Sequence, residues 1–161
     1  MIRDARAEDA AAIARIYGHY IAKTVITFEE SPVSDAEIRA RMQKVSAAGL
    51  PWLVHEEDGA LIGYAYAGRW HERSAYRFSA ETTIYLDAHQ LGRGLGTALY
   101  AALVERLREL GLHTAIGGIA LPNPGSIALH EKLGFRQVGH HREVGFKFDR
   151  WIDVGYWQLL L

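Results

Sequence analysis

Cysteine is absent from this chain of 161 residues. Disulfide bonds and catalysis by a thiolate are therefore excluded. An excess of charge of either sign is also missing, because 18 Lys and Arg stand against 19 Asp and Glu and the net charge is −1. This balance gives no electrostatic reason to expect a nucleic acid or a membrane surface as a partner.

Long hydrophobic runs are missing as well. The first residues, MIRDARAEDA, mix acids and bases and lack the apolar core of a signal peptide. No apolar run reaches the roughly 18 residues that a membrane-spanning helix needs. We also find no internal repeat, linker or low-complexity tract. These observations predict a single soluble domain over residues 1–161, in the cytoplasm, where the lack of cysteine suits a reducing compartment.

The apolar pattern predicts an α/β (α+β) fold in the order β-α-α-β-β-β-α-β-α-β-β. Hairpins give antiparallel pairs, and the strand-helix-strand unit over 82–119 gives a parallel pair, so the sheet is mixed. We expect about seven strands and about four helices. The segment 24–28 (TVITF) is β-branched and looks extended, and 68–79 looks like a loop. The seven strands are expected near 2–5, 52–55, 61–67, 82–86, 114–119, 138–148 and 154–160.

Local signals mark the ends of several elements. Residues 34–37 have a capping-box pattern, and Asp58-Gly59 is a strong hairpin turn. Asn123 followed by Pro124 makes a good helix start. The helix behind residue 96 is expected to end at Gly111 and to bury a stripe of Leu99, Leu103, Leu107 and Leu110.

Three glycines, Gly92, Gly94 and Gly96, stand directly in front of that helix. Glycine loses more conformational entropy on folding than other residues, so three glycines here need a physical reason. A ligand that comes close to the backbone would be one. The first N–H groups of a helix lack internal partners and favour an anion, and Arg93 adds a positive charge. The arrangement predicts a phosphate site, and the alternative is a glycine-rich turn without a ligand.

Two common phosphate motifs do not fit this loop. The P-loop needs a Lys-Ser or Lys-Thr that is absent here. The dinucleotide fingerprint would place its third glycine at Leu99 or at Thr97. A third pattern, Gln/Arg-x-x-Gly-x-Gly/Ala, fits residues 91–96 except that Leu91 takes the first position.

That third pattern is the pyrophosphate loop of acetyl-CoA-dependent enzymes, and the whole chain resembles the GCN5-related N-acetyltransferases. More narrowly, it resembles the phosphinothricin and methionine sulfoximine N-acetyltransferases. The resemblance covers nearly all the chain. It rests on the segments ITFEE, AYRFSAETTIYL, LPNPGSIALHEKLGF and GFKFDRWIDVGYWQLLL. The last of these segments is quite specific to this subfamily.

The resemblance implies two catalytic residues. Glu81, which opens the strand TTIYL, falls where the family places a catalytic glutamate. An ordinary glutamate, with a pKa of about 4.3, is a weak base, so it would act through water or with a pKa raised by an apolar site. The alternative is a strand-edge carboxylate in water. His130 lies near the active site in the resembling enzymes, and its alternative is a structural histidine.

The resemblance also implies acetyl-CoA as the acetyl donor. The pantetheine arm would lie along the strand 84–86 like an added strand, and the glycine loop would hold the pyrophosphate. Asn123 would meet the cofactor, cap a helix or do both, with Ser126 near it. The residues expected to bind acetyl-CoA are Ile84, Tyr85, Leu86, Gly92, Arg93, Gly94, Leu95, Gly96, Thr97 and Asn123.

The acceptor side is expected to come from the loop 68–79. Arg73 and Arg77 suit a carboxylate or phosphinate because the guanidinium fork matches two oxygens, and the alternative is a pair of solvated surface charges. Trp70, Tyr76 and Phe28 would wall the pocket. The residues expected around the acceptor are Phe28, His71, Glu72, Arg73, Arg77, Glu81, Thr82 and Thr83.

The function that the resemblance implies is direct acetyl transfer to the α-amino group of a small amino-acid analogue, within a homodimer. Methionine sulfoximine, methionine sulfone and phosphinothricin are the expected types. The alternatives are another amine (a peptide N-terminus, a polyamine or an aminoglycoside) or a non-catalytic acyl-CoA-binding module. Among eight histidines only His140 and His141 are adjacent, and strand neighbours point to opposite faces, so we predict no metal.

Overall fold

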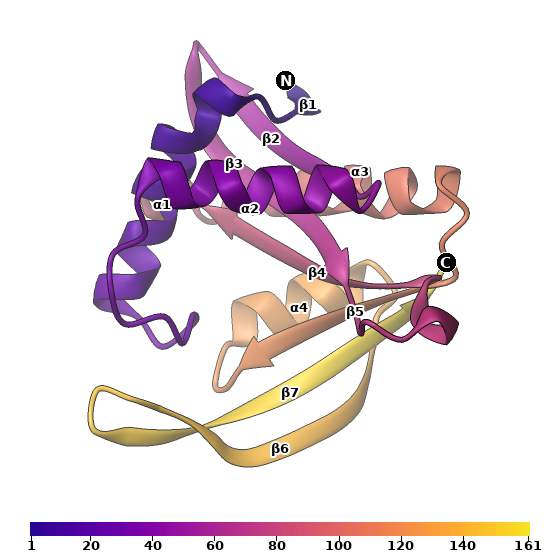
Figure 1. The fold of residues 1–161 in the computed structure, drawn as a ribbon. Helices are drawn as coiled ribbons and strands as arrows, with labels where there is room; N and C mark the ends of the chain where they lie inside the picture. The colour runs from indigo at the N-terminus through magenta and orange to yellow at the C-terminus, as the bar shows by residue number, and fades with distance from the viewer.

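The computed structural model describes all residues, 1–161, and its centre is one seven-stranded sheet in the order β1-β2-β3-β4-β5-β7-β6 (Figure 1). Only β4 and β5 pair in parallel, so the sheet is mixed as predicted. The strands are β1 (Ile2–Asp4), β2 (Trp52–Glu57), β3 (Ala60–Arg69), β4 (Ser79–Leu86), β5 (Thr114–Ala120), β6 (Arg136–Lys147) and β7 (Arg150–Leu160).

Four helices cover the two faces of the sheet. Buried residues of α1 and α2 form one apolar cluster with β2 and β3, and buried residues of α3 form a second cluster with the other face. The helices are α1 (Ala10–Lys23), α2 (Asp35–Ala47), α3 (Leu95–Glu109) and α4 (Pro124–Lys132). Their start signals act as predicted, because Ser34 accepts from the Glu37 amide and Asn123 accepts from the Ser126 amide.

Strands β4 and β5 separate soon after they meet. Their pairing covers only Ser79 to Glu81 on β4 and Thr114 to Ile116 on β5. Figure 1 shows the two strands side by side at one end and diverging toward the other. The backbone of β4 beyond Glu81 therefore has no strand partner on this side, and this divergence positions the candidate site.

The β6–β7 hairpin closes the far edge of the sheet. Its turn residues Phe148 and Asp149 both have positive φ, 52° and 57°, which suits the twist of a tight hairpin. The register shifts between His141 and Gly145, where Glu143 has φ 53°. Such a bulge adds local twist, and Figure 1 shows the twisted end of the hairpin lying below the α1–α2 connection.

The predicted fold class and element order are confirmed, and two local predictions are wrong. Residues 24–28 are expected to be extended, but only Thr24 is shown to have extended backbone, and residues 25–27 are bends. They lie in the α1–α2 connection, where Thr27 bonds to Tyr17 and to Lys147 instead of to a ladder. Leu110 is 50% exposed, because it caps α3 and lies past the buried stripe. None of the helices combines the length and apolar character that a membrane crossing requires.

Candidate active site

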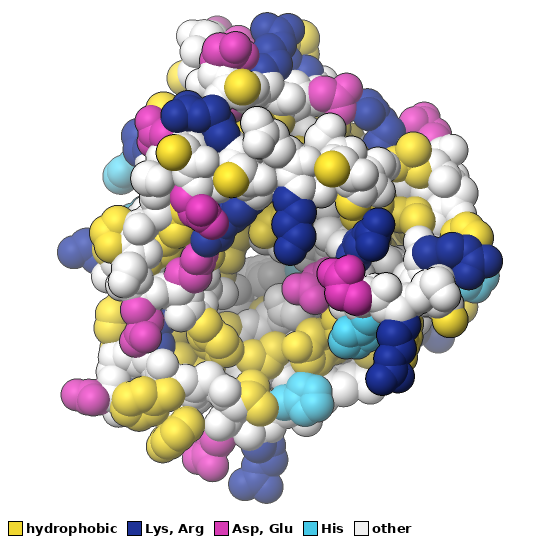
Figure 2. All heavy atoms as spheres, viewed as in Figure 1, with side chains coloured by type: hydrophobic (Ala, Val, Ile, Leu, Met, Phe, Trp, Pro, Cys, Tyr) yellow, Lys and Arg dark blue, Asp and Glu magenta, His cyan; other side chains and the backbone are white.

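Two cavities meet in the divergence between β4 and β5. The first, of about 290 Å³, contains Glu81 and is called the Glu81 cavity. The second, of about 490 Å³, contains the glycine loop and is called the glycine-loop cavity. Figure 2 shows a deep hollow between α2 and the β6–β7 hairpin. Five residues line both cavities, so the two form one continuous cleft: Ile26, Ile84, Tyr85, Asn123 and Ser126.

The glycine loop has the geometry of an anion cradle. Gly92 and Gly94 have φ of +79° and +75°, a region that L side chains rarely adopt. Gly94 begins α3, and no side chain caps the first N–H groups of the helix. These groups therefore remain available to an anion. The predicted loop residues Gly92, Gly94, Leu95, Gly96 and Thr97 all line the glycine-loop cavity.

Arg93 differs from its loop neighbours. Its guanidinium donates to Glu57 at 3.1 Å and to Gln90, and the residue does not line the cavity. Leu91, at the position where the family pattern has Gln or Arg, lines the cavity and is 58% exposed. Lys132 of α4 supplies the cation that lines this cavity.

The predicted cofactor strand lies along the cleft. Ile84 and Tyr85 line both cavities, and Leu86 lines the glycine-loop cavity. The Leu86 carbonyl already accepts from the Tyr20 hydroxyl at 2.6 Å. Tyr85 packs against Tyr17 and Tyr20, with ring centroids 5.1 and 4.9 Å apart, so Tyr85 is both a core residue and a cleft residue.

Glu81 lies at the point where β4 leaves β5. Glu81 is an exposed residue of the chain, and its side chain lines the Glu81 cavity. Desolvation raises the pKa of Glu81, and nearby His71 opposes part of that rise. No hydrogen bond contributes to the shift. A carboxylate with a raised pKa and a free lone pair is suited to accept a proton.

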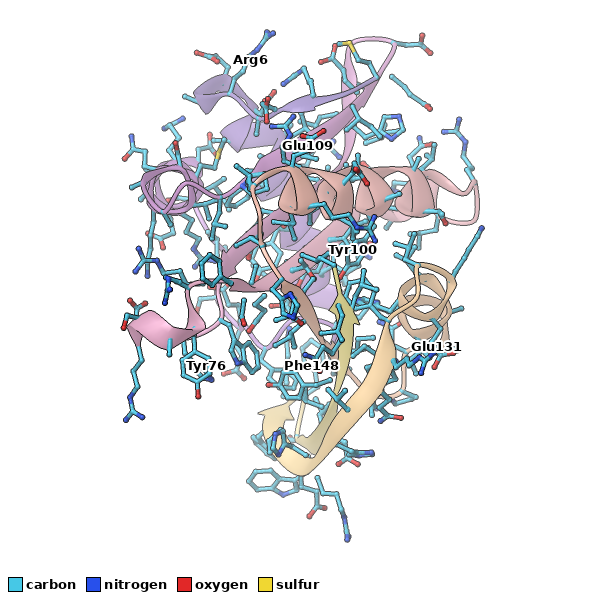
Figure 3. The ribbon with its side chains drawn as sticks, turned by 90° about the vertical axis from the view of Figure 1, so that its right-hand side faces the viewer. Arg6, Tyr76, Tyr100, Glu109, Glu131 and Phe148 are labelled. Atoms are coloured by element: carbon cyan, nitrogen blue, oxygen red, sulfur yellow. The ribbon has the colours of Figure 1, made fainter.

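His130 belongs to a buried hydrogen-bond chain. Its Nδ1 lies 2.7 Å from the Ser126 carbonyl, which can only accept, so Nδ1 carries the proton. Its Nε2 therefore accepts from the Tyr100 hydroxyl at 3.0 Å, and that hydroxyl lies 2.6 Å from the Thr82 hydroxyl. Tyr100 is a residue of α3, and Figure 3 shows it on the lower side of that helix, on the side of the sheet that α4 also covers.

Burial keeps this imidazole neutral. Desolvation lowers the pKa of His130, and the hydrogen bond to the Ser126 carbonyl raises it by less. His130 is 4% exposed, and a Cβ at Gly117 would stand 2.8 Å from its Cδ2 and closer to Nε2. Both ring nitrogens are therefore occupied by groups of the protein, although the residue lines the Glu81 cavity.

Tyr100→Phe is expected to lower the free energy of unfolding by about 1–3 kcal/mol, because it leaves Nε2 of His130 without its donor. Denaturant unfolding measures this loss. Tyr76→Phe, which removes a hydroxyl from a 41%-exposed side chain, is the matched control. The pH profile of kcat is expected to stay unchanged in Tyr100→Phe. A shifted profile would mean that the chain carries a catalytic proton.

The residues predicted around the acceptor divide into two groups. Phe28, Glu81, Thr82 and Thr83 line the Glu81 cavity together. Those of the 68–79 segment lie outside its lining: His71, Glu72, Arg73 and Arg77 line a separate hollow beside the end of α2.

Neither Arg73 nor Arg77 lines the cavity that holds Glu81. Arg77 donates to the Ser74 carbonyl and its guanidinium lies 4.5 Å from the centre of the Phe78 ring. Arg73 lines a hollow with Tyr76, away from the cleft. Within one chain, therefore, the structure does not bring the predicted anion partners to the cavity that holds Glu81.

Sequence reasoning missed several wall residues of the Glu81 cavity. Val154 and Tyr156 point into it from β7, and Gly118 lies below Tyr156. Desolvation and the charge of Glu81 raise the pKa of the Tyr156 hydroxyl. The alternation of β7 puts Val154 and Tyr156 on one face, but only the β4–β5 divergence turns that face into a cavity wall. No group of three or more potential metal ligands occurs in the chain.

A diverging parallel strand pair, an uncapped glycine cradle and a carboxyl in the adjoining cavity together form a cleft that suits an extended anionic ligand. Residues 2–155 match the model of the acetyltransferase (GNAT) domain, and the chain belongs to this family. It is an acetyl-CoA-dependent N-acetyltransferase.

The sequences of curated relatives align with almost the whole chain. A phosphinothricin N-acetyltransferase of Alcaligenes faecalis is 43% identical over 95% of this chain and 78% of its own length. An L-methionine sulfoximine/L-methionine sulfone acetyltransferase of Salmonella typhimurium is 36% identical over 99% of this chain and 94% of its own. These matches confirm the family and subfamily resemblance.

Solved structures confirm the fold. A phosphinothricin acetyltransferase from Sinorhizobium meliloti in complex with acetyl-CoA has a TM-score of 0.96 at 42% identity, covering 100% of this chain and 88% of that one. An acetyltransferase from Salmonella typhimurium, also with acetyl-CoA, has a TM-score of 0.96 at 35% identity, covering 100% and 93%. Acetyl-CoA is thus bound by structures that this chain closely resembles.

Proposed function

We propose that this enzyme acetylates the α-amino group of a small amino-acid analogue of the methionine sulfoximine, methionine sulfone or phosphinothricin type. The observation that carries the proposal is Glu81, a carboxyl with a raised pKa in a small cavity that adjoins the glycine-loop cavity. Acetyl-CoA supplies an activated acetyl thioester. The names of the relatives support the acceptor class.

The cradle in this proposal fits the phosphates of acetyl-CoA. The free N–H groups of α3 and the backbone of Gly92 and Gly94 hold the pyrophosphate, and Lys132 adds charge. The backbone of β4 beyond Glu81, which is unpaired on the side of β5, meets the pantetheine amides as an added strand would. The thioester then lies beside Glu81.

Glu81 acts as the general base for direct attack. It takes a proton from the acceptor amine, directly or through one water, while the amine nitrogen bonds to the thioester carbon. The carbon–sulfur bond then breaks and the thiolate takes up a proton. Tyr85 lines both cavities, so we propose the Tyr85 hydroxyl as the donor of this proton. His130, whose two nitrogens are occupied, is proposed to position Ser126 and α4.

The size of the Glu81 cavity favours a small acceptor. Its volume of about 290 Å³ lies at the lower end for small-molecule sites. Phe28 and Tyr156 wall it, whereas a peptide acceptor needs an open groove. The proposed roles of Arg73 and Arg77 as anion partners then require the 68–79 segment to move toward the cavity when the acceptor binds.

Turnover against a panel of amines tests this function. Release of free CoA thiol is measured with methionine sulfoximine, methionine sulfone, phosphinothricin, ordinary amino acids, a peptide, spermidine and an aminoglycoside. Saturable turnover with the analogues alone supports the proposal. Turnover only with the peptide, polyamine or aminoglycoside would replace the acceptor class. Acetyl-CoA binding without any turnover would favour a non-catalytic module.

We also propose that the chain forms a homodimer. The β6–β7 hairpin exposes Val144, Phe146, Phe148 and Trp151, each more than half exposed, and exposed apolar patches mark contact surfaces. The rings of Phe146 and Trp151 pack at 4.8 Å between centroids. Light scattering is expected to give twice the chain mass, and Trp151→Ser is expected to shift it toward one chain mass. A monomeric wild type would refute the dimer.

A further inference from the structure

The ring of Phe28 lies directly on the backbone of strand β6. A Cβ built on Gly145 would stand 2.9 Å from Cε1 of this ring and closer still to Cε2 and Cζ. Real Cβ atoms essentially never come this close to another heavy atom, so only glycine allows the ring its present position. Gly145 is buried by this contact, whereas its neighbours Val144 and Phe146 are exposed.

The same ring forms part of the Glu81 cavity wall. Phe28 lines that cavity and remains 39% exposed. One side of the ring therefore rests on Gly145 while another part faces the space beside Glu81. The space available at residue 145 therefore determines where the ring lies in the cavity wall.

The backbone around Phe28 is held on both sides. The Lys147 Nζ, on a side chain only 1% exposed, donates to the Thr27 carbonyl at 2.9 Å. The Thr27 hydroxyl lies 2.7 Å from the Tyr17 hydroxyl. On the other side, the Glu29 carboxylate accepts from Arg41 at 2.6 and 2.9 Å. Because both neighbouring residues are held by these bonds, a side chain added at residue 145 is expected to displace the ring of Phe28 and not its backbone.

We propose that Gly145 is a specificity-determining residue for the acceptor amine, which acts by setting the position of Phe28. Any side chain at 145 pushes the ring off its present place and alters the wall of the Glu81 cavity. The inference rests on the proposed function, because it takes that cavity as the acceptor site. One added or missing methylene in an apolar pocket changes discrimination by about 10-fold or more.

Gly145→Ala tests the proposal, with Gly139→Ala as its matched control. Gly139 lies on the same strand, but a Cβ there meets no heavy atom within 4 Å. The acceptor used is the amine that the wild type turns over best in the panel. Gly145→Ala is expected to lower kcat/KM for the acceptor at least tenfold and to leave the KM for acetyl-CoA within twofold. Gly139→Ala is expected to match the wild type.

Phe28→Ala supplies the second arm. Without the ring there is nothing to displace, so Gly145→Ala is expected to have no further effect on kcat/KM in this background. An equal effect in both backgrounds would overturn the proposal. So would an unchanged acceptor kcat/KM in Gly145→Ala, or a parallel loss for acetyl-CoA, which would indicate general damage to the fold.

A third measurement needs no acceptor. The Phe28 ring lies close enough to shift the Gly145 Hα resonances by its ring current, and Phe28→Ala is expected to remove that shift. Unmoved resonances would overturn the contact. If the wild type uses a polyamine, the proposed acceptor class is wrong. The change in kcat/KM for that polyamine in Gly145→Ala then still tests this inference. If the wild type acetylates nothing, both fail together.

Discussion

Glu81→Gln is expected to lower kcat at least tenfold while acetyl-CoA binds as it does to the wild type. The amide keeps the shape of the side chain but cannot accept the acceptor's proton, and a positioned base is worth about 10²–10⁴-fold. The glycine cradle, which lies in the neighbouring cavity, is untouched. Steady-state kinetics and calorimetric titration with acetyl-CoA measure the two quantities separately.

The pH dependence gives this prediction a second readout. A base works only when deprotonated, and desolvation raises the pKa of Glu81. The acid limb of the kcat/KM profile is therefore expected above the pH of an ordinary glutamate, and it is expected to vanish in Glu81→Gln. Unchanged turnover in the variant, with the limb still present, would remove Glu81 from the role of base.

Gly94→Val is expected to weaken acetyl-CoA binding at least tenfold. Its Cβ would project from the loop into the space through which phosphates approach, and φ of +75° disfavours any L side chain by about 1–2 kcal/mol. Gly94→Ala is expected to show the same effect at smaller size. The dissociation constant from calorimetric titration is the measurement.

Gly111→Val is the matched control for this loop. Gly111 follows the other end of α3, has φ of +76° and faces open space, so the substitution imposes similar backbone strain away from the cleft. It is expected to lower the melting temperature without changing acetyl-CoA affinity. Wild-type affinity in a folded Gly94→Val would refute the assignment of the loop to the pyrophosphate.

Local signals predicted the elements well because each depends on neighbouring residues. The cap at Ser34, the turn at Asp58-Gly59 and the start at Asn123 all require only a few adjacent groups. The segment TVITF was predicted to be extended because its residues favour strands. In the folded chain Thr27 has hydroxyl and ammonium partners from α1 and β6, and no neighbouring strand.

Residues of the candidate site could be predicted from the sequence only where the residue type itself indicates a chemical role. The backbone freedom of Gly92 and Gly94 pointed to the loop that lines the glycine-loop cavity, and Glu81 was predicted from the family resemblance. Tyr156 could not be found in this way, because its place in the cavity depends on where β7 runs relative to β4. The orientation of Arg73 and Arg77 likewise depends on a segment with no regular pattern to predict.

The short pairing of β4 with β5 places a strand edge inside the sheet instead of at its border. An open edge normally recruits strands of other molecules and promotes aggregation. Here α4 and the α1–α2 connection line the gap, so it opens only into a cleft that a slender chain can enter. The unpaired backbone groups of β4 are thus within reach of a narrow molecule in the cleft but are shielded from the β-strands of other proteins in a crowded solution.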